Sequence, residues 1–317
     1  TMNPSPEELL EHLRKKYPDG RYKSVYEAGF SGFWIHRRLT ELGIENIVVN
    51  PADVGTTQKE KDRKTDRVDA GKLSRELESG KLEPIYIPSE SLEHIRSLWR
   101  LHYKIRCQLV AVKNRIKMHL HFLGIALPEH SMSKTWSGPF LKWIEALEID
   151  FYEKQYFVSC VEQIRFINNQ LKSLRKQIIA QLSSKGREYE IIRLLCSVPG
   201  IGITSALTLY TEIADITRFP KLDNLASFVG LRPTVFSSGE KRIDGGLTKR
   251  RNAHLRYILI EAAWQSLRRD PSLLLSYSNL CKRMKKQEAI IRIARKLLNR
   301  IRYVWKNNEL YVKGVVK

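Results

Sequence analysis

Short apolar runs alternate with amphipathic stretches over the first ninety residues. The pattern predicts helices over residues 6–17, 33–42 and 65–79, where apolar side chains recur every three or four positions. It predicts strands over residues 21–26, 45–50 and 82–88, which are short, apolar and bounded by turn residues. Strands that alternate with helices favour parallel pairing, so this part should form an α/β layer.

Two long amphipathic helices are predicted next, within residues 91–187. The first carries apolar residues three or four apart at Ile105, Leu109, Val112, Ile116, Leu120 and Leu123. The second shows a heptad seam at Phe157, Cys160, Ile164, Ile167, Leu171, Leu174 and Ile178. Helices with such seams usually pair, either as a hairpin within one chain or between two chains, and the sequence leaves both arrangements open.

Residues 188–317 are predicted to be all-helical and compact, with glycine turns. Helices over residues 191–197 and 204–213 flank a tight turn that contains Gly200 and Gly202. This arrangement is typical of a helix-hairpin-helix, in which turn amides and a helix N-terminus face a DNA phosphate. An ordinary helical turn is the alternative.

Charge is distributed unevenly along the 317 residues. The chain has 55 Lys and Arg against 34 Asp and Glu, a net charge of +21, yet residues 1–90 carry 15 basic and 16 acidic side chains. The excess therefore lies in residues 91–317, which favours a polyanion partner for this part over a merely solubilising surface. Four separated cysteines argue against a zinc site or a disulfide framework, and no apolar run is long enough for a membrane span. We expect a cytoplasmic protein without a membrane partner.

Two constellations could carry chemistry. Asp66 and Asp69 are three residues apart on a predicted helix, and Glu27 ends a predicted strand, so their carboxylates could clamp Mg²⁺. Neighbouring lysines and arginines could instead pair with the two aspartates. Ser237 and Ser238 precede a glycine and a strongly basic stretch, which allows either a nucleophile beside cations or a simple phosphate-binding turn.

Several motifs, taken in chain order, resemble the DEDD transposases of the insertion-sequence 110 family. The N-terminal motifs are YEAGFSG at residues 26–32, NPADV at 50–54 and KTDRVDA at 64–70. The C-terminal motifs are PGIG at 199–202, LASFVGL at 225–231, SSG at 237–239, GGLTK at 245–249 and NAHLR at 252–256. The resemblance covers nearly the whole chain.

The resemblance implies three parts: an RNase H-like (RuvC-like) domain over residues 1–90, a coiled-coil region over 91–187 and a helical transposase domain over 188–317. It implies recombination of donor and target DNA guided by a structured bridge RNA, with Mg²⁺ held by four acids and a serine–DNA covalent intermediate. By position, Glu27, Asp66 and Asp69 match three acids and Ser238 matches the nucleophile, with Ser237 as the neighbouring alternative. We also expect a homo-oligomer formed through the coiled coil, in a prokaryotic nucleoid.

The expected nucleic-acid contacts cluster in the C-terminal part. They are Gly200, Gly202, Lys241, Arg242, Lys249, Arg250, Arg251, Asn252, His254 and Arg256, extended by a basic C-terminal helix over residues 282–306. The charges of that helix should project outward, because its apolar positions give it a face to bury.

The sequence departs from the family pattern at one point. The family's first acid lies in a G-I-D-like string on an opening strand, and neither Asp19 nor Asp53 matches it. We therefore expect a domain lacking its first strand, a metal site one ligand short and impaired catalysis by this chain. Two alternatives stay open: a pilin-inversion-type recombinase that works without a guide RNA, and a non-catalytic nucleic-acid-binding remnant.

Overall fold

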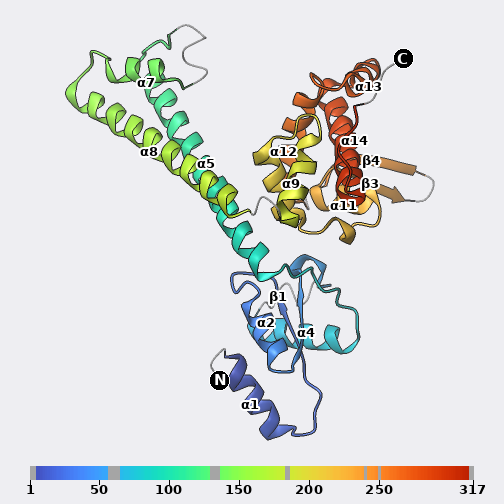
Figure 1. Cartoon of the computed structure of the whole chain (residues 1–317). Helices are drawn as coiled ribbons and strands as arrows, with labels where there is room; N and C mark the ends of the chain where they lie inside the picture. The colour runs from blue at the N-terminus through green and yellow to red at the C-terminus, as the bar shows by residue number, and fades with distance from the viewer. Residues whose placement is uncertain are drawn as a thin grey trace. The chain divides into compact units, whose positions relative to one another are not determined.

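The chain divides into two compact units, Thr1–Pro88 and Ser89–Lys317. The computed structural model describes residues 5–55, 65–128, 136–182, 186–238, 241–248 and 251–313, with the backbone alone for residues 233–238 and 241–245. Figure 1 shows the elements of each unit. Among the described residues, no helix combines the length and the apolar character needed to cross a membrane.

The first unit is a small α/β layer. Its elements are α1 (Pro6–Lys16), β1 (Lys23–Glu27), α2 (Trp34–Glu41), β2 (Glu45–Val49), the 3-10 turn η1 (Pro51–Asp53) and α4 (Asp66–Glu78). β1 and β2 pair in parallel, from Lys23 opposite Glu45 to Glu27 opposite Val49. Leu10, Leu39 and Ile44 form a small buried core between α1 and α2. The predicted parallel pairing is confirmed.

Local sequence signals set the helix boundaries in this unit. The Ser5 side chain accepts a hydrogen bond from the Glu8 amide at the start of α1, and Thr65 does the same for the Val68 amide at the start of α4. Such caps satisfy backbone N–H groups that have no partner within the helix. The strand predicted over residues 82–88 is wrong: the described chain forms only an isolated bridge between Val49 and Pro84. Prolines 84 and 88 donate no ladder hydrogen bond, which explains the failure.

A long helical hairpin begins the second unit. It consists of α5 (Glu90–Phe122) and α8 (Phe151–Gln181), with the short α7 (Gly138–Glu145) between them. Their apolar seams pack against each other within the chain, with Ile116 and Ile164 fully buried. Contacts of Arg115 with Gln163 (3.4 Å) and His119 with Glu153 (2.5 Å) show that α5 and α8 run antiparallel. The structure therefore selects the intrachain pairing that the sequence left open.

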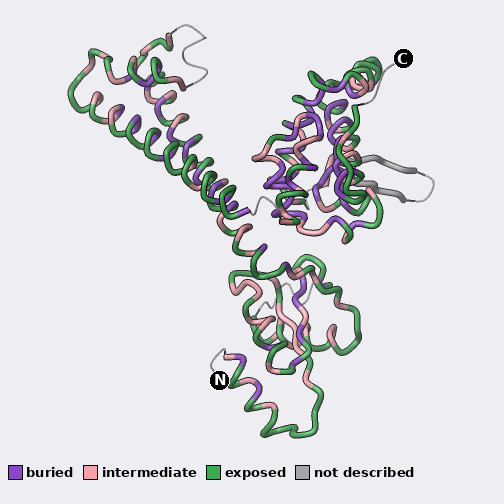
Figure 2. Tube along the Cα trace, in the orientation of Figure 1, coloured by how far each residue is buried: buried purple, intermediate pink, exposed green. Residues whose placement is uncertain are grey.

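The remaining helices form the largest core. They are α9 (Arg187–Ser197), α10 (Ile203–Ile213), the 3-10 turn η2 (Ile216–Arg218), α11 (Leu222–Val229), α12 (Ala253–Ser266), α13 (Pro271–Cys281) and α14 (Lys286–Asn307). α14 contacts α9, α11, α12 and α13 and buries residues three or four apart, among them Ile293, Leu297 and Ile301. Figure 2 shows the buried positions concentrated in these helices. Trp99 of α5 and Ile178 of α8 also join this core.

The C-terminal part is not all-helical, and that prediction is wrong. An antiparallel hairpin of β3 (Pro233–Ser238) and β4 (Lys241–Leu247) lies between α11 and α12. Proline at position 233 disfavours helix, and Val235, Phe236 and Ile243 are residue types that favour strands. These strand-favouring residues are few, and the helical periodicity on both sides of them extends over many more positions.

Candidate functional site

The β3–β4 hairpin carries both candidate serines. Ser238 is registered opposite Lys241, and Ser237 opposite Arg242. Because successive strand positions belong to opposite faces, the two serines occupy different faces, each with one basic position across the ladder. Ser238 is the last residue of β3. Lys249 and Arg250, also expected at this site, lie outside the described residues.

Close backbone contacts hold the base of the hairpin. The Thr248 amide donates to the Arg232 carbonyl (3.3 Å), and the Asn252 amide donates to the Phe228 carbonyl (3.1 Å). Gly230, at the end of α11, has a φ of +82° and packs directly against the Arg251 side chain. The chain segments that enter and leave the hairpin are therefore tied to each other.

A buried carboxylate adjoins this base. Glu212, near the end of α10, has a side chain only 5% exposed. Its Oε1 accepts from Arg100 Nε (2.7 Å), and its Oε2 accepts from Arg100 Nη2 (2.8 Å) and from Asn252 Nδ2 (2.9 Å). Burial raises the pKa of Glu212, but the Arg100 and Asn252 hydrogen bonds outweigh it and lower the pKa overall. The carboxylate is therefore ionised at neutral pH.

His254 lies in the first turn of α12. It stacks on Tyr103 of α5, with ring centroids 3.8 Å apart. Burial lowers the pKa of His254; Glu212 opposes this shift, while Arg106 and Arg100 add to it. The imidazole is therefore neutral at pH 7. Burial and the positive charge of Arg251 lower the pKa of Arg256.

The three predicted metal ligands lie in the first unit. Glu27 ends β1 and is exposed, Asp66 begins α4 and is exposed, and Asp69 is half-buried in the first turn of α4. α4 packs against β1, so the two elements that carry these carboxylates are neighbours. Lys64, one of the neighbouring basic residues that could pair with the aspartates, lies outside the described residues.

These carboxylates suit Mg²⁺ chemically, because the ion prefers hard oxygen ligands. Among the described residues, however, no group of three or more His, Cys, Asp or Glu side chains lies close enough to hold a metal ion. The convergence of Glu27, Asp66 and Asp69 on one ion therefore stays a prediction.

Comparison with known proteins identifies the family. The profile described as "Transposase IS116/IS110/IS902 family" matches residues 192–278, and a DEDD transposase profile of the IS110 group, described as "Transposase", matches residues 4–125. The chain belongs to the IS110/IS902 family of transposases. A DEDD domain implies an RNase H-like fold for the first unit and is typically metal-dependent.

Three relatives illustrate the similarity. The Sinorhizobium fredii protein y4qE is 29% identical over 75% of this chain and 57% of its own length. The protein y4rJ of the same organism is 29% identical over 92% of this chain and 78% of its own length. The transposase for insertion sequence element IS1111A of Coxiella burnetii is 24% identical over 77% of this chain and 65% of its own length. The chain thus spans little more than half the length of y4qE.

The turn at Gly200 has a packing role in this member of the family. Its φ is +87°, and a Cβ atom there would lie 2.3 Å from the Ala262 carbonyl oxygen of α12. Only glycine allows this approach. Gly202, by contrast, caps α10 and is exposed. Phosphate contacts at these two glycines stay a prediction.

The basic side chains of α14 do not all project outward as we expected. Arg300 donates to buried Asp270 (2.6 Å), Arg302 donates to the Phe219 carbonyl (3.2 Å), and Arg295 pairs with Asp223. Lys285, Lys286, Arg292 and Lys306 are exposed. Part of the charge that the sequence assigned to nucleic acid therefore stabilises the fold.

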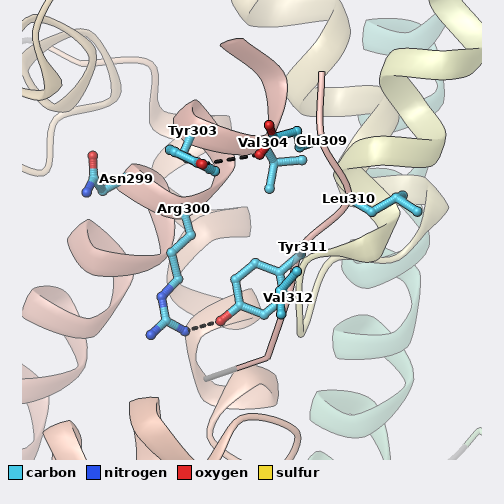
Figure 3. A pocket seen from close by; sticks show the side chains of 8 residues that line it. All are labelled: Asn299, Arg300, Tyr303, Val304, Glu309, Leu310, Tyr311 and Val312. Carbon is cyan, nitrogen blue, oxygen red and sulfur yellow. Dashed lines mark hydrogen bonds between the residues drawn. The ribbon is translucent and has the colours of Figure 1, made fainter. Parts of the chain in front are cut away.

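A pocket lies where the C-terminal segment folds over α14, and the serine hairpin and the three acids do not line it. Its lining comprises Asn299, Arg300, Tyr303, Val304 and residues 309–312. Figure 3 shows the Arg300 guanidinium directed at the Tyr311 hydroxyl, which also donates to Asp270. This network anchors the C-terminal segment to the helical core.

Sequence reasoning missed Glu212 and Arg100. The available signal was a single acid within an otherwise apolar and threonine-rich helix, at residues 203–213. A carboxylate in such a helix is buried only when it is paired, so it pointed to a basic partner elsewhere.

Proposed function

We propose that this transposase cuts and rejoins donor and target DNA through a covalent serine–DNA intermediate, with Ser238 as the nucleophile. The observation that carries the proposal is the position of Ser238 at the end of β3, opposite Lys241, on a hairpin whose base is fixed by the helical core. Cations beside a serine can stabilise the charge that develops on an attacked phosphate.

The proposed step balances as a transesterification. The Ser238 oxygen attacks a DNA phosphorus, the bond from phosphorus to the leaving deoxyribose oxygen breaks, and that oxygen takes up a proton while the serine loses one. The serine–DNA phosphodiester conserves the energy of the broken bond. Attack by the hydroxyl of a second DNA end reverses the step, joins the strands and frees Ser238.

The test is denaturation-resistant adduct formation by the natural full-length protein on DNA carrying the element's ends. Ser238→Ala should abolish the adduct and leave DNA affinity unchanged. Ser227→Ala, at an exposed serine of α11, is the matched control and should form adduct at the normal rate. Adduct that persists in Ser238→Ala and vanishes in Ser237→Ala moves the role to Ser237. Adduct in both variants rejects the serine mechanism.

We also propose Mg²⁺ as the cofactor, with Glu27, Asp66 and Asp69 as ligands. Support comes from the donor chemistry, the packing of α4 against β1 and the typical metal dependence of DEDD domains. Bound Mg²⁺ would neutralise charge on the attacked phosphate.

A structured bridge RNA is the proposed guide, supported by the family resemblance and by the basic excess of residues 91–317. RNA that co-purifies with the protein should map to non-coding DNA beside the gene. Recombination that continues after ribonuclease treatment, with no such RNA present, would favour the pilin-inversion type of reaction.

The proposed homo-oligomer forms through the α5–α8 hairpin. Phe166 of α8 is 68% exposed and lines a shallow groove with Val112 and Ile167. Phe166→Asp should reduce the mass measured by light scattering to that of a smaller species. Tyr152→Asp, at another exposed aromatic position of α8, is the control and should leave the mass unchanged.

A further inference from the structure

The Glu212 carboxylate connects two elements that are distant in sequence. Arg100 lies on α5, and Asn252 lies between β4 and α12, where the chain leaves the serine hairpin. Glu212 bonds both at once, with distances of 2.7 to 2.9 Å. Its two oxygens accept three hydrogen bonds from these partners.

Asn252 has its backbone N–H and its side chain engaged. Its side-chain oxygen accepts from the Leu255 amide (3.1 Å) and so caps α12, while its side-chain nitrogen donates to Glu212. Its own amide donates to Phe228 of α11 (3.1 Å). These bonds fix the orientation of the Asn252 amide, since a flipped amide would place its NH₂ against the Leu255 N–H.

The α5 side of the connection is equally constrained. Arg96 Nε donates to the Thr211 carbonyl (2.6 Å), and Trp99 Nε1 donates to Thr208 Oγ1 (2.8 Å). Together with Arg100, these residues hold one face of α5 against α10. The Arg100–Glu212–Asn252 connection therefore starts from a helix that cannot shift without breaking several bonds.

We propose that Glu212 is a positioning residue for the serine hairpin, acting through Asn252 to hold the segment by which the chain leaves β4. The proposal rests on the proposed role of Ser238. Glu212 does not contact DNA in this role; its carboxylate holds Asn252, whose backbone amide bonds to Phe228 of α11.

The principal test is Glu212→Gln. Glutamine has the shape of glutamate, but it replaces one acceptor oxygen with an NH₂ group. This NH₂ group faces an N–H donor of Arg100 or Asn252, so at least one hydrogen bond is lost. We expect adduct formation to slow by about 10- to 100-fold, because small misplacements of a reacting group cost this much. DNA affinity should change less than about twofold, since no phosphate contact is lost.

A matched control separates positioning from simple loss of stability. Asp270 is a second buried carboxylate that is bonded by an arginine, Arg300, in the same unit. Asp270→Asn should destabilise the fold but leave the adduct rate unchanged at temperatures where the protein stays folded. Equal slowing in both variants under those conditions overturns the proposal.

A compensating double variant provides a sharper readout. Glu212→Gln combined with Asn252→Asp exchanges the amide and the carboxylate, so the pair can bond again while position 252 still caps α12. The adduct rate should recover by at least about tenfold over Glu212→Gln alone. No recovery, in a double variant that is folded, contradicts the positioning role.

Hydrogen exchange keeps this test independent of the serine chemistry. Amides of Thr248 and Asn252 should exchange faster in Glu212→Gln than in Asp270→Asn. If adduct formation proves independent of both Ser237 and Ser238, the proposed function fails, yet this measurement still decides whether Glu212 holds the hairpin base. Unchanged exchange at both amides rejects the inference.

Discussion

A Cβ atom on Gly230 would lie 2.3 Å from the Cβ atom of Arg251. No side chain fits between the end of α11 and the segment that leaves the serine hairpin. With a φ of +82°, position 230 also has a backbone conformation that other residues adopt only under strain.

Gly230→Ala should therefore lower the stability of the second unit and loosen the hairpin base. The left-handed conformation costs about 1–2 kcal/mol, and the clash adds roughly 1–3 kcal/mol. Gly124→Ala is the control, because Gly124 has a φ of +70° with nothing within 4 Å of its added Cβ. Thermal unfolding followed by circular dichroism should show a larger loss for Gly230→Ala, and equal losses would contradict the contact argument.

The Tyr311 hydroxyl predicts a loss of stability at alkaline pH. Burial and its hydrogen bond to Asp270 raise the pKa of Tyr311 to about 12, against about 10 in an unfolded chain. The unfolded state releases this proton first, so stability is complete below pH about 10 and falls as the pH rises toward 12.

Tyr311→Phe should remove this part of the alkaline decline in melting temperature. Tyr152→Phe, at a tyrosine that is 80% exposed, should leave the decline unchanged. A wild-type profile that matches Tyr311→Phe from pH 9 to 12 would contradict the prediction. It would show that the pKa of Tyr311 is the same in the folded and unfolded states.

Nucleic-acid binding should weaken steeply with salt through counterion release. The combined variant Lys285→Gln/Lys286→Gln/Arg292→Gln, at exposed positions of the C-terminal part, should reduce the slope of log affinity against log salt by up to about 3. Arg14→Gln/Lys15→Gln/Lys16→Gln removes the same charge from α1, in the part of the chain without a basic excess, and should leave the slope intact. Fluorescence anisotropy at several salt concentrations measures the slope for the wild type and for each variant. Equal slopes in all three proteins would exclude α14 from the interface.

The proposed metal ligands can be tested without activity. Asp66→Asn and Asp69→Asn should each weaken Mn²⁺ binding by at least about tenfold, which is the smallest effect usual for groups that support a bound metal. Electron paramagnetic resonance of free Mn²⁺ measures the affinity. Glu78→Gln, at an exposed acid at the other end of α4, serves as the control. Unaltered affinity in both aspartate variants would remove them from the ligand set.

Local signals made most helices predictable. α14 follows from apolar residues three or four apart, and α1 and α4 follow from the caps at Ser5 and Thr65. Periodicity and capping are properties of neighbouring residues, so they are visible before the chain folds. The same local information suggested the serines, the basic stretch and the acids as candidates, and the ordered motifs identified the family.

Only the tertiary structure decided how the candidate site is held. Glu212 lies 112 positions from Arg100 and 40 positions from Asn252, and Gly230 meets Arg251 only after the β3–β4 hairpin closes. These contacts exist because α5 packs on α10 and the hairpin returns the chain to α11. The spacing of apolar residues does not predict these long-range contacts. They depend on which buried faces and polar groups come together when the whole unit packs.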